Sequence, residues 1–235
     1  MARFVLVHGA WHGAWCYEKL VPALEARGHD ALAIDLPGHG SDATPPRDAT
    51  LGSYVRRVGE ALARAPEPAV LLGHSMGGVI ITQAGEDHAP HIRSLVYLAA
   101  FLPRDGEGLA SFRAASAVTD LLRSDREAGV VHLDPSGARH AFYHDCSDAD
   151  VAAAVARLGP QPAAPWRENV RIGARFASLP RHYIECAQDH AIPLELQRRM
   201  HAATPCRLHT LQASHSPFYS MPESLADVLD AIARS

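Results

Sequence analysis

Residues 69–78 read Ala-Val-Leu-Leu-Gly-His-Ser-Met-Gly-Gly, and this stretch decides the fold. The apolar residues 69–72 predict a short buried strand, and the apolar residues at 79–81 and 84 predict the start of a helix. Between them, Gly73-His74-Ser75-Met76-Gly77 fits Gly-x-Ser-x-Gly, the pattern of a serine on a sharp strand-to-helix turn. Glycines are needed there because side chains would collide with neighbouring backbone. The turn lifts the Ser75 hydroxyl clear of the sheet, beside a helix N-terminus that favours negative charge.

The composition is that of an ordinary globular protein, with 47% hydrophobic and 20% charged residues. At 235 residues, the chain can bury a full core, and one domain is the default expectation. The net charge is −4, and Lys19 is the only lysine. Because no arginine cluster forms a basic stripe, nucleic acid is not an expected partner.

Three further patterns bear on cellular location and on metal binding. The four cysteines, at positions 16, 146, 186 and 206, lack Cys-x-x-Cys spacing and indicate reduced side chains in a cytoplasmic protein. The chain begins directly before its first apolar run, so we expect no signal peptide, and no run is long enough to cross a bilayer. The fifteen histidines are dispersed and match no metal-ligand pattern, so no metal site is expected.

Six short segments, most of them apolar, predict strands, and helix patterns alternate with them. The segments cover residues 4–7, 31–34, 69–72, 94–98, 182–186 and 207–211. This alternation predicts an α/β fold with a mostly parallel six-stranded sheet and helices on both faces. Residues 103–177 break the alternation and are too long for a structureless loop, so we expect an inserted lid over one end of the sheet. Residues 1–102 and 178–235 then form the core.

The loops at the carboxyl ends of such strands form the active-site crevice, and Ser75 lies in one of them. A serine hydroxyl is a poor nucleophile at neutral pH and needs a histidine base held by an acid, in the chain order serine, acid, histidine. His215 follows the last strand and is the predicted base, whereas His209 lies within that strand. Asp189, after the preceding strand, is the predicted acid. Asp105, after the fourth strand, is the alternative.

The tetrahedral oxyanion of acyl transfer needs two preorganised backbone donors. One predicted donor is the amide of Met76, the residue after the nucleophile. The other comes from the loop after the first strand, His8-Gly9-Ala10, and is assigned to Ala10. Gly9 lets the backbone approach closely, and His8 is expected to bond within the loop rather than to act as a second base.

Four stretches carry recognisable motifs: His-Gly-Ala-Trp-His-Gly-Ala-Trp (8–15), Asp-Leu-Pro-Gly-His-Gly (35–40), Gly-His-Ser-Met-Gly-Gly (73–78) and Tyr-Ile-Glu-Cys (183–186). Together they resemble the α/β-hydrolase branch that contains plant methylesterases and hydroxynitrile lyases. The similarity extends through most of the chain and is weakest in residues 103–139. It implies a triad of Ser75, His215 and Asp189, an oxyanion hole from Ala10 and Met76, and no cofactor.

Two positions separate the esterases from the lyases of that branch. The lyases that resemble this chain carry threonine where Gly9 stands, which crowds the oxyanion site. They also carry lysine directly after the catalytic histidine, to stabilise the departing cyanide. That position is Ser216 here, so both residues favour ester hydrolysis over cyanohydrin cleavage.

The predicted substrate pocket lies beside the oxyanion loop. Trp11 is expected to narrow it, and Phe101, Leu102, Tyr143 and Trp166 are further candidates for its lining, together with Gly9. Tyr143 and Trp166 have core packing within the lid as an alternative. This lining suits a small apolar or aromatic acyl group, including that of a methyl ester, hydrolysed through an acyl-enzyme on Ser75.

Two other functions stay open at this stage. One is non-hydrolytic chemistry on the same scaffold, such as lyase-like carbon–carbon cleavage or a biosynthetic cyclisation, because fold and triad underdetermine the reaction. The other is a ligand-binding protein that has kept its pocket. The expected partner is a small-molecule ester, with neither nucleic acid nor a membrane, and a homodimer is left open.

Overall fold

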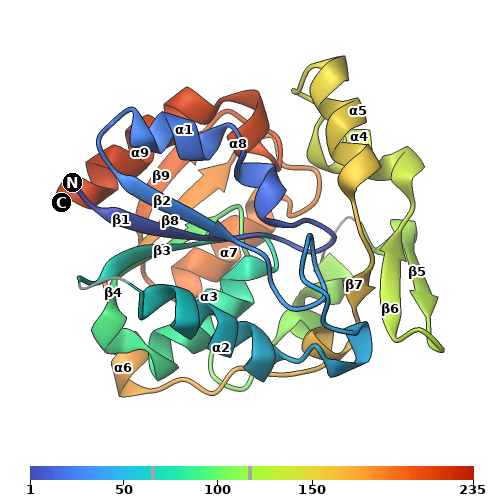
Figure 1. Ribbon diagram of the computed structural model, residues 1–235, viewed down its shortest axis with the longest axis horizontal. Coiled ribbons are helices and arrows are strands. Elements are labelled where there is room, and N and C mark those ends of the chain that lie inside the picture. The colour runs from blue at the N-terminus through green and yellow to red at the C-terminus, as the bar shows by residue number, and fades with distance from the viewer. Residues whose placement is uncertain (65–66, 116–117) are drawn as a thin grey trace.

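The computed structural model describes residues 1–64, 67–115 and 118–235 and confirms the predicted six-stranded sheet. Neighbouring strands are parallel and follow the order β2-β1-β3-β4-β8-β9 (Figure 1). All six residues of β3 are buried, as expected for a central strand covered on both faces. The strands are β1 (Arg3–Val7), β2 (Asp30–Ile34), β3 (Ala69–His74), β4 (Ile92–Leu98), β8 (Arg181–Cys186) and β9 (Arg207–Leu211).

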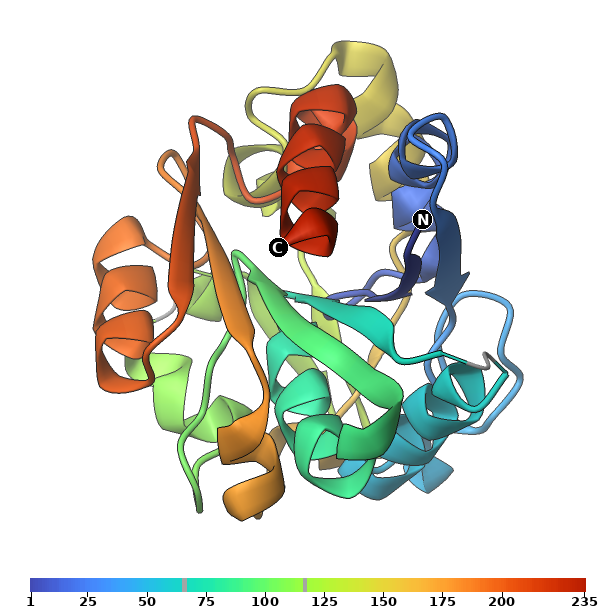
Figure 2. The same ribbon diagram turned by 90° about the vertical axis from the view of Figure 1, so that its left-hand side faces the viewer.

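Helices cover both faces of this sheet, as the alternating pattern predicts. In Figure 1, α1 (Leu20–Glu25) and α9 (Pro222–Arg234) lie above the sheet, and α2 (Leu51–Leu62) and α3 (Gly77–Asp87) lie below it. Figure 2 shows the same two layers after a quarter turn. The other helices of the core are α6 (Ala174–Ser178), α7 (Leu194–Ala203) and α8 (Pro217–Ser220), and single 3₁₀ turns are η1 (Ala14–Tyr17), η2 (Pro46–Asp48) and η3 (Ala89–His91).

The segment expected to form a lid contains a small second sheet that the sequence did not predict. Its strands are antiparallel and follow the order β5-β6-β7. Figure 1 places this sheet with α4 and α5 at the end toward which the strands of the main sheet run. The elements are β5 (Leu122–Asp125), β6 (Val130–Leu133), β7 (Gln161–Pro162), α4 (Ala138–Phe142), α5 (Asp148–Arg157), η4 (Leu109–Ala115), η5 (Thr119–Leu121), η6 (Pro135–Gly137) and η7 (Ala164–Trp166).

Hydrogen bonds and an ion pair attach this segment to the core. The indole Nε1 of Trp11 donates to the carbonyl of Val131 at 2.9 Å. Lys19 pairs with Asp150 at 2.6 Å. The division between core and lid at residue 177 stays a prediction, and α6, which packs against α3, crosses it. Within the described ranges, no helix has the length and hydrophobicity that crossing a membrane requires.

Candidate active site

Ser75 lies on the predicted strained turn between β3 and α3. Its φ angle is 54°, in the left-handed region that residues with a side chain seldom adopt. A Cβ atom on Gly73 would lie 2.6 Å from the carbonyl oxygen of Gly77, and one on Gly77 would lie 2.7 Å from that of Val7. Only glycine therefore fits at these two positions, which is the physical reason for the spacing of the motif.

The predicted acid and base are bonded to each other. Nδ1 of His215 donates to Oδ2 of Asp189 at 2.7 Å, and both side chains are almost completely buried. Oδ1 of Asp189 accepts the amides of Ala191 and Ile192, at 2.7 and 2.9 Å. The side-chain amide of Gln197 donates to Oδ2 at 3.3 Å. Four donors thus hold the carboxylate in one orientation, and the carboxylate holds the imidazole with Nε2 as the atom left to act as base.

His74, inside the serine motif, ties the turn to the loop that carries the base. Its Nε2–H donates to the carbonyl of His215 at 2.9 Å, and the two rings lie 4.5 Å apart. Burial lowers the pKa of His74 well below its ordinary value, so the ring is neutral at pH 7. The contact fixes His215 relative to Ser75 without adding a charge beside the imidazole.

The alternative acid, Asp105, lies elsewhere. Its side chain is exposed, and Oδ1 accepts the amide of Ile172 at 2.9 Å within the segment between β4 and β8. Its carboxylate is used by that backbone contact and is not bonded to His215, whose Nδ1 bonds Asp189 instead. The structure therefore favours Asp189, as the sequence does.

Two backbone N–H groups are available where the oxyanion would form. Ala10 and Met76 line the same cavity as Ser75. Among the described residues, neither amide N–H has a hydrogen-bond acceptor. Two unpaired donors beside a nucleophile are what oxyanion stabilisation requires. The loop before Ala10 packs tightly on the turn, because a Cβ atom on Gly9 would lie 3.0 Å from Cβ of Ser75.

Two histidines fix the oxyanion loop. Nδ1 of His8 donates to the carbonyl of Gly9 at 2.8 Å, which confirms the expected bond within the loop. Nδ1 of His12 donates to the carbonyl of Ala10 at 2.7 Å, and Nε2 accepts the hydroxyl of Tyr143 at 2.5 Å. Burial lowers the pKa of His12 to about 4, so the neutral tautomer that these two bonds require is the stable form at pH 7.

A cavity of about 200 Å³ opens above Ser75 and contains three of the predicted pocket residues, Trp11, Phe101 and Trp166. Most of the remaining wall comes from β5, β6 and the turns around them, and no periodicity in the sequence marked these residues. The other lining residues are Leu109, Ala110, Val118, Thr119, Leu122, Ser124, Val131, Phe142, Ala163, Arg167, Ala191 and Ile192.

Three residues expected in the pocket lie behind its wall instead, within the described part of the chain. Leu102 is buried, with its amide directed at Sδ of Met200 at 3.4 Å. Tyr143 is completely buried and uses its hydroxyl on His12, as the alternative of a packing residue predicts. Trp166 both lines the cavity and packs against Trp11. Gly9 lies under the turn. These assignments to the lining are corrected accordingly.

Comparison with known proteins supports the same architecture. The profile of the alpha/beta hydrolase family matches residues 4–228. The chain belongs to this family. A putative chloroplastic methylesterase 11 of Arabidopsis thaliana is 34% identical over 99% of the chain, which spans 64% of that relative's length. A pyrethroid hydrolase of Sphingobium wenxiniae is 33% identical over 96% of the chain and 85% of the relative.

Solved structures of family members have closely similar folds. The pyrethroid hydrolase from Sphingobium faniae matches with a TM-score of 0.92 at 32% identity, covering 100% of this chain and 98% of the other. A methylesterase from Arabidopsis matches with a TM-score of 0.89 at 26% identity, covering both chains completely. The predicted family and fold class are confirmed, and the relatives' names agree with the predicted class of carboxylic ester hydrolase.

Proposed function

We propose that this protein is a serine carboxylesterase that hydrolyses small, apolar or aromatic esters through an acyl-enzyme on Ser75. One observation carries the proposal. Ser75, Ala10 and Met76 line one cavity, and the amides of Ala10 and Met76 have no acceptor among the described residues, while a neighbouring loop presents His215 fixed by Asp189. These parts form the constellation that acyl transfer needs: a nucleophile, an oriented base and two oxyanion donors.

Each step of the reaction has a residue to perform it. Nε2 of His215 takes the proton of Ser75 as Oγ attacks the ester carbonyl, and Asp189 stabilises the imidazolium that results. The amides of Ala10 and Met76 hold the oxyanion. His215 then gives its proton to the departing alcohol, and water repeats the sequence on the acyl-enzyme to release the acid.

The size and walls of the cavity support a small substrate. Its volume of about 200 Å³ lies below the roughly 300 to 1,000 Å³ of pockets that enclose drug-sized ligands. Trp11 stacks on Phe142 and meets Trp166 edge to face, with ring centroids 6.1 and 5.5 Å apart. Such walls suit an acyl group of one ring or a short chain, and a methyl ester keeps the alcohol part small.

The surroundings of Gly9 and Ser216 also support hydrolysis over cyanohydrin cleavage. A Cβ atom on Gly9 would lie 3.0 Å from Cβ of Ser75, so a side chain at this position presses on the nucleophile turn. Ser216 is completely buried beside His215 and brings no cation to the leaving group. We also propose a cytoplasmic location, because all four cysteines are unpaired thiols, as in a reducing compartment.

The experiment is hydrolysis of p-nitrophenyl butyrate and methyl benzoate by the wild type, Ser75→Ala and Ser178→Ala, with fluorophosphonate labelling of each. Ser178 is the matched control, because it is an exposed serine outside the cavity wall. We expect Ser75→Ala to lose the label and about 10⁴-fold or more in kcat, and Ser178→Ala to keep both. A wild type that takes no label would favour a ligand-binding protein. Labelling without hydrolysis of any ester would favour a non-hydrolytic reaction.

A further inference from the structure

The wall of the cavity contains one charged side chain among the described lining residues. Arg167 follows η7, and its amide bonds the carbonyl of Ala164 at 2.9 Å, which fixes the backbone at the end of that turn. Ser75, on the turn after β3, is half-buried. Arg167 and Ser124 also line the cavity but are exposed, so these two residues mark its mouth.

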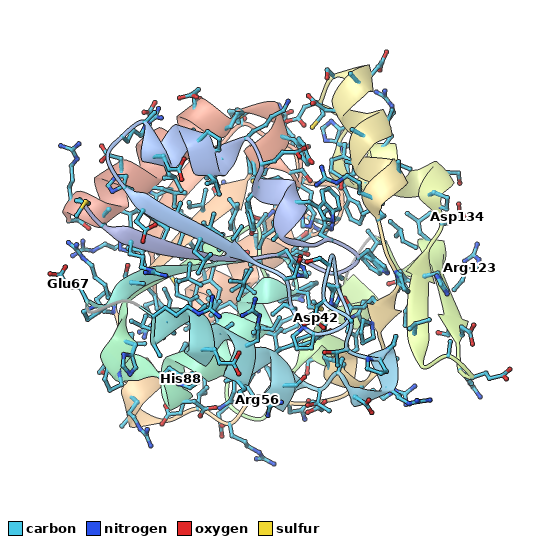
Figure 3. All side chains as sticks on the ribbon, in the orientation of Figure 1. Asp42, Arg56, Glu67, His88, Arg123 and Asp134 are labelled. Carbon is cyan, nitrogen blue, oxygen red and sulfur yellow. The ribbon has the colours of Figure 1, made fainter. Side chains whose placement is uncertain are left out.

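The charge of Arg167 is not neutralised by any described residue. Some exposed arginines have carboxylate partners, such as Arg123 with Asp134 at 3.8 Å on the outer side of the small sheet (Figure 3). No ion pair or side-chain hydrogen bond of Arg167 occurs within residues 1–64, 67–115 and 118–235. The neighbouring Glu168 turns away and accepts the amide of Leu51 at 3.1 Å.

The polar groups at the mouth are therefore hydrogen-bond donors with a net positive charge. A guanidinium offers five N–H donors in a planar fork that matches a carboxylate, and a serine hydroxyl can add one more. The described lining residues include no Asp or Glu that would repel an anion. An apolar cavity that has a half-buried nucleophile and an exposed, free arginine in its wall fits a ligand that has an ester at one end and an anion at the other.

We propose that Arg167 makes this enzyme selective for esters that carry a carboxylate remote from the ester bond, such as monoesters of an aromatic dicarboxylic acid. The inference rests on the proposed esterase function and adds the class of substrate. The ring of such a monoester lies against the wall formed by Trp11 and Trp166, its ester meets Ser75, and its free carboxylate reaches Arg167. Removal of the guanidinium weakens binding of the anionic ester and leaves that of a neutral ester unchanged.

The test compares monomethyl terephthalate with methyl 4-methylbenzoate, which has a methyl group in place of the carboxylate. The proteins are the wild type, Arg167→Gln and, as matched control, Arg171→Gln. Arg171 is also exposed, and it lies outside the cavity wall. Both variants remove one positive charge, so a difference between them reports position rather than net charge.

We expect Arg167→Gln to lower the ratio of kcat/KM for the anionic over the neutral ester about 3- to 10-fold, mainly through KM, because the pair is exposed at the mouth. Arg171→Gln keeps the wild-type ratio. Raising NaCl from about 20 mM to about 500 mM lowers the ratio for the wild type but not for Arg167→Gln, since salt screens exposed charges. An unchanged ratio in Arg167→Gln overturns the inference, even if both esters are hydrolysed.

Binding gives a second readout that needs no turnover. Calorimetry of monomethyl terephthalate with Ser75→Ala, and with Ser75→Ala combined with Arg167→Gln, measures the arginine contribution directly. We expect the affinity for monomethyl terephthalate to fall by the same factor of about 3 to 10, because an exposed ion pair contributes little free energy. Binding that is lost with Arg167, in a protein that hydrolyses no ester, would retain the inference and refute the esterase. If the wild type hydrolyses neutral esters but both variants bind monomethyl terephthalate equally, the esterase function would be retained and the role of Arg167 refuted.

Discussion

Replacement of Asp189 by asparagine tests the triad, because an asparagine cannot accept all the hydrogen bonds that the carboxylate accepts. The carboxylate accepts from His215 and Gln197 on one oxygen and from the amides of Ala191 and Ile192 on the other. An asparagine has one acceptor oxygen and one NH₂ group. Whichever way the amide is turned, its NH₂ faces two N–H groups that had an acceptor before.

The effect on catalysis follows from the tautomer of the base. If the amide oxygen keeps the contacts to Ala191 and Ile192, NH₂ faces Nδ1 of His215, which must then become an acceptor. The imidazole proton moves to Nε2, the atom that has to take the proton of Ser75. We expect kcat to fall about 10⁴-fold, equivalent to about 5.5 kcal/mol of transition-state stabilisation. The unpaired donors also lower the free energy of unfolding by about 1 to 3 kcal/mol.

The assay is steady-state hydrolysis of p-nitrophenyl butyrate near neutral pH, with thermal unfolding to show that the variant is folded. Asp105→Asn is the control, since this carboxylate bonds only to the segment between β4 and β8 and is the alternative acid. It should keep kcat within about twofold of the wild type. The reasoning is refuted if Asp189→Asn keeps more than about a tenth of the wild-type kcat, or if Asp105→Asn causes the larger loss.

Three further predictions concern the oxyanion loop and its histidines. Gly9→Thr should lower kcat for esters about 100-fold, because the added Cβ atom would lie 3.0 Å from Cβ of Ser75 and displace the nucleophile. An unchanged kcat would contradict the close packing. Tyr143→Phe leaves Nε2 of His12 without its donor, so kcat should fall severalfold at constant KM, with about 1 to 3 kcal/mol less stability by urea unfolding. A parallel rise in KM would instead indicate a pocket role. Finally, the folded-state pKa of His12, about 4, lies below the unfolded value, so its contribution to stability is present above pH 6.5 and is lost as the pH falls toward 4. The free energy of unfolding should be about 2 kcal/mol lower at pH 5 than at pH 7 from His12 alone, and equal values at both pH would refute this.

The sequence by itself predicted the main sheet, the serine turn and the candidate triad, because each depends on local signals. Buried strands require continuous apolar runs, and the turn at Ser75 requires glycine wherever a Cβ atom would strike backbone. Parallel strands then bring their carboxyl ends together, so the loops that carry Asp189 and His215 had to meet near Ser75.

Only the tertiary structure decided which residues form the pocket and what fixes the oxyanion loop. β5 is four residues long and mostly exposed, so it has no apolar run or alternation to mark it, and its partner β6 determines its place. Trp11 and His12 bond to residues 120 and 131 positions away, in the segment between β4 and β8. The position of Arg167 at the mouth of the cavity likewise depends on how the segment between β4 and β8 folds over Ser75. Contacts between segments distant along the chain leave no periodic trace in either segment, and so folding alone establishes them.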